Sequence, residues 1–448
     1  MAFGFFKKKA ACADKVFYNG HIYTMDPGLP WAEAVAVSDG KVMAVGNYDQ
    51  MDSIIDDDTE VIDLEERYML PGFIDIHHSP VMKMIGSDGI DEEEEQEAEE
   101  AEEKNIFASM DHAAVYEYAD DGEIDESASD EEEAAEDEEA AEDEEPEVSE
   151  EEDTEKEEEF DGYEDDETEY YVDNSEFNSR VEETLEKLSD RGFTTVMDIA
   201  TPHQIENEFL NSLIELYTEE KLSHRFFGTL YINQPVPARL VKEVLNMRRT
   251  KCTELGDMIK NEFLYIKLDE EDGKAFPLTD IQEIMAECAD RGFSFYIEAM
   301  GEEDLLKAYR AVDHIRNKGY KNIVIIASDE VLTEEEEAEL SASDTVYLTW
   351  RSDAMGRSYF EGEITDIEEA IEHLTLGSAE MIGMEDKLGS IEKDKYADFA
   401  VFSENPLECR AGELSRLYCD MTVVNGEIIH DVDEENDEYM MDMILHSR

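Results

Sequence analysis

The chain has 448 residues, of which 121 are Asp or Glu and 36 are Lys or Arg, so its formal net charge is −85. This acidity excludes a general affinity for nucleic acids or anionic membrane surfaces, because both carry charge of the same sign. A hydrophobic share of 41% excludes a fully disordered chain, and no apolar run approaches the ~18 residues that span a bilayer. The five cysteines are scattered and odd in number, which predicts reduced thiols and a cytoplasmic protein.

The N-terminal segment, residues 1–68, is predicted to be rich in β-structure. Residues 34–46 alternate apolar with small or polar residues around Asp39-Gly40, which is the pattern of a β-hairpin. The next segment, 69–90, is expected to contain a first buried strand, Met69–Ile74, and the loop after it.

Residues 91–174 form an acidic low-complexity insertion. Positions 91–170 hold 44 acidic and only two basic residues, and the Glu/Ala runs among them contain no core-forming residue. Such a stretch cannot bury enough apolar surface to offset its ordering entropy, so we predict disorder. The alternative is a polyanionic arm that binds cations or a basic protein.

Residues 175–385 alternate helical periods with apolar strands. In three places a segment with helical periodicity ends in a basic residue, a glycine comes next, and an apolar strand follows. A glycine in this place is typical of a helix C-terminus. The three units are Val181–Arg191, Gly192 and Phe193–Asp198; Ile281–Arg291, Gly292 and Phe293–Glu298; and Leu305–Lys318, Gly319 and Tyr320–Ile326.

This alternation predicts an α/β protein with a parallel sheet. Further strand candidates are Phe226–Ile232, Phe263–Leu268 and Thr345–Trp350, and with Met69–Ile74 they bring the number of candidates to seven. A closed (β/α)₈ barrel fits this order, with a reduced or open barrel as the alternative because an eighth strand is not visible.

The C-terminal segment, residues 386–430, is β-rich again. It contains a short strand, Ala397–Phe402, and a second hairpin pattern around Asn425-Gly426. We therefore expect the two ends of the chain to form a composite β-sandwich beside the barrel. Residues 431–448 are an acidic tail.

Several of these stretches resemble the amidohydrolase superfamily, in particular its metal-dependent hydrolases that act on N-substituted amides and formamides. They are Ala13–Asp26 with Trp31–Val37, Met69–Asp75, Arg191–Asp198, Leu374–Glu380 and Leu388–Asp398. The resemblance implies a TIM-like (β/α) barrel with a β-sandwich. It also implies hydrolysis of a carbon–nitrogen bond other than a peptide bond, by water that a divalent metal (Zn or another) activates.

The same resemblance implies the site residues. His77, which follows Pro71-Gly-Phe-Ile-Asp75, is similar to a metal ligand of the family. Lys267 stands where related enzymes carry a carboxylated lysine, and Glu298 is a chemically suitable substitute ligand. Asp353 resembles the catalytic general base.

This chain departs from the family pattern at four positions where the resemblance implies histidines. Ser79 follows His77-His78, Tyr296 and Glu298 stand in place of the two histidines of one strand, and Ser328 ends a later strand. These losses favour a second hypothesis, a non-catalytic amidohydrolase-like protein whose acidic insertion binds cations or a basic partner. No nucleic-acid or membrane partner is expected, and a small amide-type substrate is expected only if the site is active.

Overall fold

The computed structural model describes residues 12–76, 174–198, 206–268, 276–328, 345–350, 366–410, 414 and 417–432. The acidic insertion up to residue 173, most of the acidic tail, His77 and Asp353 therefore lie outside the described residues. None of the helices in the described ranges is long and apolar enough to cross a membrane.

The two β-rich segments of the chain pair with each other, as expected, but their described strands form one mixed sheet, so the predicted β-sandwich is seen only in part. The strand order is β15-β14-β13-β5-β1-β2-β3, and β4 pairs with β1. Its apolar residues, Phe17, Val35, Phe399 and Val423 among them, form a shared core. The strands are β1 (Lys15–Tyr23), β2 (Trp31–Ser38), β3 (Lys41–Gly46), β4 (Glu60–Asp63), β5 (Tyr68–Pro71), β13 (Phe399–Phe402), β14 (Met421–Val424) and β15 (Glu427–Asp431), with short 3₁₀ turns at Tyr48–Gln50 and Pro406–Glu408.

The two predicted hairpins are confirmed. β2 and β3 are joined by Asp39 and Gly40, whose φ angles are 52° and 71°. β14 and β15 are joined by Asn425 and Gly426, with φ angles of 52° and 76°. Two consecutive residues with positive φ give the turn whose twist matches that of the flanking strands.

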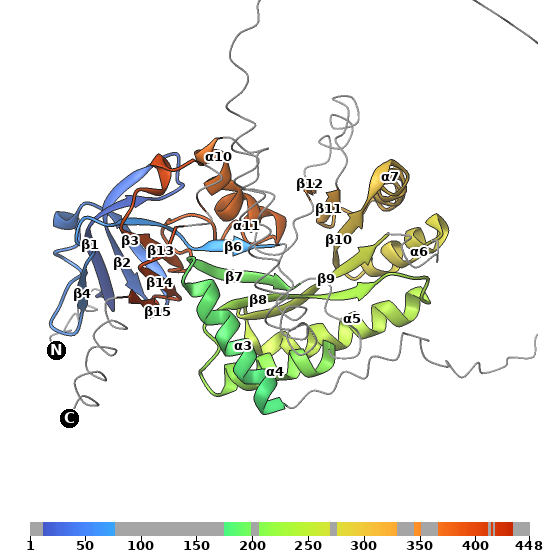
Figure 1. Cartoon of the computed structure of the whole chain (residues 1–448), viewed down its shortest axis with the longest axis horizontal. Coiled ribbons are helices and arrows are strands. Elements are labelled where there is room, and N and C mark those ends of the chain that lie inside the picture. Colours follow the sequence, from blue (N-terminus) through green and yellow to red (C-terminus); the bar gives the residue numbers. More distant parts are fainter. Residues whose placement is uncertain are drawn as a thin grey trace, which may run out of the picture. The chain divides into compact units, whose positions relative to one another are not determined.

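The middle of the chain forms a seven-stranded parallel sheet that curls into a half-barrel (Figure 1). The order is β12-β11-β10-β9-β8-β7-β6, so all seven predicted strands are present. Within the described ranges no eighth strand joins β12 to β6, which corresponds to the open alternative. The strands are β6 (Phe73–Asp75), β7 (Phe193–Asp198), β8 (Arg225–Ile232), β9 (Ile259–Lys267), β10 (Ser294–Ala299), β11 (Val324–Ser328) and β12 (Val346–Trp350).

Helices cover the outer face of the half-barrel (Figure 1). β8 to β11 pack there against α5, α6 and α7, and β6 and β7 pack against α3 and α4. The helices are α3 (Asn174–Ser189), α4 (Glu206–Thr218), α5 (Ala238–Cys252), α6 (Leu278–Ala289), α7 (Gly301–Asn317), α10 (Ile367–Glu372) and α11 (Ser378–Met381), with a 3₁₀ turn at Thr253–Leu255 and a π-helical turn at His373–Gly377.

The inner face has its own apolar cluster. It contains one or two residues from most strands, such as Met197, Phe263 and Ile325, and it is completed by Met384 and Leu388 from the segment after α11. This cluster packs the described side chains of the concave side against one another.

Three predicted strands differ clearly from those observed; one of them, predicted from Phe263, starts four residues earlier, at Ile259. The candidate Met69–Ile74 is divided: β5 joins the sheet of the chain ends, and β6 begins the half-barrel after Gly72. A Cβ at Gly72 would lie 2.3 Å from the Thr194 side chain, so this close approach requires glycine. The strand predicted from Tyr320 starts only at Val324, and the side-chain amide of Asn322 just before it donates to the carbonyls of Ala289 and Phe293.

Candidate active site

Two of the predicted site residues lie side by side at the carboxyl ends of neighbouring strands. Lys267 is the last residue of β9 and is in register with Glu298 of β10. The Leu268 amide donates to the Glu298 carbonyl over 2.9 Å, which continues the pairing past the end of β9. Side chains alternate along a strand, so both face the same side as the inner-core residues Tyr265 and Tyr296. In barrels of this type the carboxyl ends of the strands carry the reaction.

Glu298 is held by a residue that the sequence did not single out. The Tyr265 hydroxyl donates a hydrogen bond to Oε2 of the Glu298 carboxylate. The two side chains are deeply buried, with 1% of Tyr265 and 6% of Glu298 exposed. Burial, and next the charge of Glu298, raises the pKa of Tyr265 well above its ordinary value, so the phenol keeps the proton that it donates.

Three tyrosines form a row beneath this hydrogen bond. The ring of Tyr265 lies 5.2 Å from that of Tyr231 and 5.3 Å from that of Tyr296, measured between centroids. The first pair is tilted and the second is edge-to-face, both favourable arrangements for aromatic rings. The signal for Tyr265 was present in the sequence, since it precedes Lys267 by two residues and therefore shares its face.

The positions where the resemblance expects histidines are occupied by other buried side chains. Tyr296 is 1% exposed and belongs to the inner core. Ser328 is the last residue of β11 and is in register with Ala299. Both positions therefore lie in the half-barrel where the sequence placed them, but neither supplies an imidazole.

The described donors do not by themselves fit a divalent metal. At the carboxyl ends of β9 and β10 they comprise one carboxylate, which already accepts a hydrogen bond, and one lysine. No group of three His, Cys, Asp or Glu side chains converges anywhere in the described part of the chain. Zinc sites ordinarily use three or four such ligands. The predicted members His77 and Asp353 lie outside the described residues.

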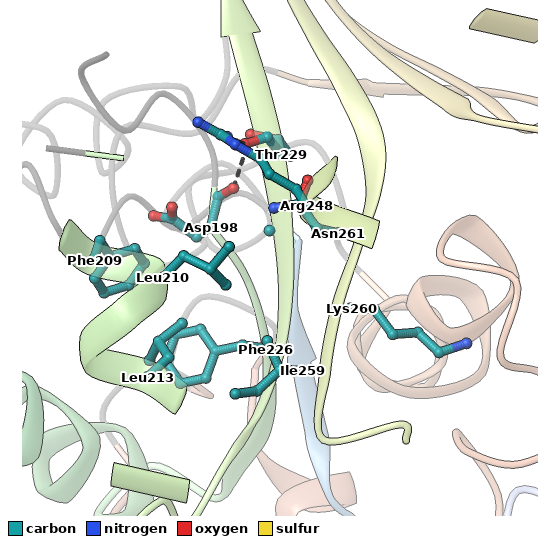
Figure 2. Close-up of a pocket in the computed structure, with 11 residues that line it drawn as sticks. Asp198, Phe209, Leu210, Leu213, Phe226, Thr229, Arg248, Ile259, Lys260 and Asn261 are labelled. Atoms are coloured by element: carbon teal, nitrogen blue, oxygen red, sulfur yellow. Dashed lines mark hydrogen bonds between the residues drawn. The ribbon is translucent and has the colours of Figure 1, made fainter. Parts of the chain in front are cut away.

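A small pocket lies on the opposite, helix-covered face of the sheet, between α4, α5 and β7 to β9 (Figure 2). Its polar side is formed by Asp198, Thr229, Arg248 and Asn261, and Arg248 donates to the Thr229 carbonyl over 3.3 Å. The cavity volume is about 20 Å³, which leaves room for roughly one water-sized group. This pocket is too small for an amide substrate, and it is separated from Glu298 by the sheet.

Comparison with known proteins finds partial similarity to amidohydrolases. Residues 341–430 match the model of the amidohydrolase family. The putative amidohydrolase YtcJ of Bacillus subtilis is 29% identical over 139 residues, which are 31% of this chain and 26% of that protein. The N-substituted formamide deformylase of Arthrobacter pascens is 31% identical over 78 residues, 17% of this chain and 14% of that protein. The chain thus matches well under a third of the length of these relatives.

Solved structures share the fold over most of the chain. An adenosine deaminase from Xanthomonas campestris with bound zinc has a TM-score of 0.59 at 12% identity, and the alignment covers 94% of each chain. A mutant atrazine chlorohydrolase from Arthrobacter aurescens, complexed with zinc and atraton, has a TM-score of 0.57 at 14% identity and covers 93% and 95% of the two chains. The family match is thus confined to residues 341–430, and the similarity to the solved structures concerns the fold.

Proposed function

We propose that this protein is a hydrolase that cleaves a carbon–nitrogen bond other than a peptide bond, at the carboxyl ends of the half-barrel strands. The substrate class is an N-substituted amide or formamide, by analogy with the formamide deformylase that matches part of the chain. In this reaction water adds its oxygen to the carbonyl carbon, the C–N bond breaks, and the nitrogen leaves with a proton.

The observation that carries the proposal is the register of Lys267 and Glu298. Glu298 is a buried carboxylate beyond an otherwise apolar and aromatic core, and its partly exposed neighbour Lys267 lies on the same face; burying a carboxylate is costly and is not required for packing. In (β/α) barrels the catalytic residues come from the carboxyl ends of the strands, where this carboxylate and this lysine lie. The location also agrees with the place of the reaction in this type of barrel.

The roles follow from the chemistry of each side chain. The Lys267 ammonium can face the carbonyl oxygen, which becomes negative as water adds. Glu298 can accept a hydrogen bond from the substrate, and Asp353, by its resemblance, takes the proton of the water. Zinc is present in two of the similar structures, whereas the described donors of this chain do not form a metal site.

A second candidate, a non-catalytic protein, is favoured by one specific observation. Tyr296 and Ser328 are buried at positions where the resemblance expects metal-binding histidines. In this alternative the acidic insertion binds cations or a basic partner, and the half-barrel is only its support.

The test is release of amine by the full chain, purified without chelator, from a panel of N-substituted amides and formamides. We expect turnover by the wild type and a fall of about 100-fold in kcat/KM for Glu298→Gln, because the substitution removes the negative charge that strengthens the hydrogen bond accepted from the substrate. Elemental analysis of the same preparation reports whether a metal is retained.

Glu262→Gln is the matched control. Glu262 lies on β9 near Arg249 and Cys252 of the outer helix layer, so the same chemical change there should leave turnover unaltered. Absence of turnover across the panel, with and without added Zn²⁺ or Mn²⁺, would reject the hydrolase and favour the non-catalytic candidate.

A further inference from the structure

Tyr265 has a more specific relation to Glu298 than packing alone requires. A buried carboxylate is costly unless it accepts hydrogen bonds, and the Tyr265 hydroxyl supplies one from the neighbouring strand. Tyr265 is in register with Tyr296, so its phenol reaches across to β10 and binds Glu298, which lies two residues beyond that partner. The hydrogen bond therefore fixes the carboxylate relative to both β9 and β10.

The ring of Tyr265 is itself held on two sides. Tyr231 of β8 lies against it at an interplanar angle of 30°, and Tyr296 of β10 meets it edge-on at 70°. Since interiors are close-packed, a ring wedged between two others has little freedom to turn its hydroxyl elsewhere. Tyr296, which replaces an expected histidine, thus packs against Tyr265. Tyr265 in turn donates to Glu298, which lies two positions after Tyr296 on β10.

We propose that Tyr265 is a positioning residue: its hydroxyl holds the Glu298 carboxylate in one orientation at the reactive end of the half-barrel, and Tyr296 holds Tyr265. This inference rests on the proposed function, because it assigns how the carboxylate of that site is oriented. It also links two departures from the family pattern, Tyr296 and Glu298, because both side chains contact Tyr265. A carboxylate that is held in the productive orientation accelerates a reaction more than a carboxylate that rotates freely.

The experiment is a double-mutant cycle of Tyr265→Phe and Glu298→Gln, with kcat and KM measured for the amide that the wild type hydrolyses best. Tyr265→Phe keeps the ring and removes only the donor. We expect kcat to fall about 10- to 100-fold, by analogy with the loss when a hydrogen-bond partner that orients a metal-ligating side chain is removed, while KM changes less than about threefold. In the Glu298→Gln background the same substitution should cost less than about threefold, because Tyr265 acts through Glu298.

Tyr320→Phe serves as the control. It removes a tyrosine–carboxylate hydrogen bond of 3.3 Å, to Asp290, outside the half-barrel interior. This variant should keep the kcat of the wild type. The melting temperature of each variant separates loss of orientation from loss of folding.

The outcomes distinguish this inference from the proposed function. A wild type that turns over, together with a Tyr265→Phe variant that keeps its kcat or loses it equally in both backgrounds, would overturn the positioning role alone. A wild type without turnover on any amide would overturn both. A loss of kcat that disappears in the Glu298→Gln background supports the positioning role.

Discussion

His224 lies just before β8 and is completely buried at the amino end of the half-barrel sheet. Its Nδ1 lies 2.8 Å from the Ser223 hydroxyl. Burial lowers the pKa of His224 from 6.5 to about 4, and a backbone hydrogen bond with Phe193 opposes this shift only in part. The imidazole is therefore neutral in the folded protein over most of the pH range in which the unfolded chain would protonate it.

This difference predicts how stability depends on pH. Between pH 6.5 and about 4 the unfolded state binds more protons at His224 than the folded state, so the free energy of unfolding falls as the pH falls through this window. Urea unfolding at about pH 7.5 and about pH 5 should show a loss on the order of 2 kcal/mol from this group. His224→Gln should lack that part of the pH dependence, and an unchanged slope in the variant would assign the effect to other groups.

At the scale of elements, two helix-to-strand turns of identical sequence can be compared. The sequence Asp-Arg-Gly-Phe occurs at residues 190–193 and at 290–293, each time between a helix and a strand. Gly192 and Gly292 have the same φ angle of 78°. Their surroundings differ: a Cβ at Gly192 would lie 2.7 Å from Cβ of Ala400 in β13, whereas a Cβ at Gly292 would meet no heavy atom within 4 Å.

Gly192→Ala and Gly292→Ala should therefore destabilise the protein to different extents. Both variants place alanine in the left-handed region, at a cost of about 1 kcal/mol. Gly192→Ala in addition forces β13 away from the half-barrel, and overpacking of this kind costs about 1–3 kcal/mol more. Chemical unfolding of the two variants measures the difference directly. Equal losses of unfolding free energy in the two variants would show that β13 moves away from the turn at Gly192 without an energetic cost.

On the scale of the whole molecule, one buried ion pair ties the half-barrel to the sheet of the chain ends. The Arg225 guanidinium donates to both carboxylate oxygens of Asp398, over 2.7 Å and 3.1 Å, and also to Oδ1 of Asn425. It lies 3.9 Å from the centroid of the Tyr396 ring. The side chains of Arg225 and Asp398 are 1% and 4% exposed. The pair thus joins β8 to the segments before β13 and after β14.

Asp398→Asn should lower the free energy of unfolding by about 3 kcal/mol, since it leaves a buried guanidinium without its counter-charge. Glu243→Gln, which removes an exposed ion pair with Arg239 on α5, should leave the unfolding midpoint unaltered and is the control. A midpoint for Asp398→Asn equal to that of the control would mean that Asn425 and Tyr396 suffice to hold Arg225.

The sequence by itself determined those features that depend on neighbours along the chain. The glycines after three helical periods, the Asp39-Gly40 and Asn425-Gly426 turns and the apolar strands are local signals, so they predicted the α/β middle and the β-rich ends. The resemblance to amidohydrolases likewise placed Lys267 and Glu298, and both lie at the ends of neighbouring strands.

Only the tertiary structure decided what depends on groups far apart in the chain. The hydrogen bond from Tyr265 to Glu298 requires the register between β9 and β10, and the division at Gly72 requires the approach of Thr194, more than a hundred residues later. The extent of barrel closure depends on which edge strands pair. Register and edge pairing are set by packing between distant segments, whereas turns and caps are set by the backbone preferences of a few consecutive residues.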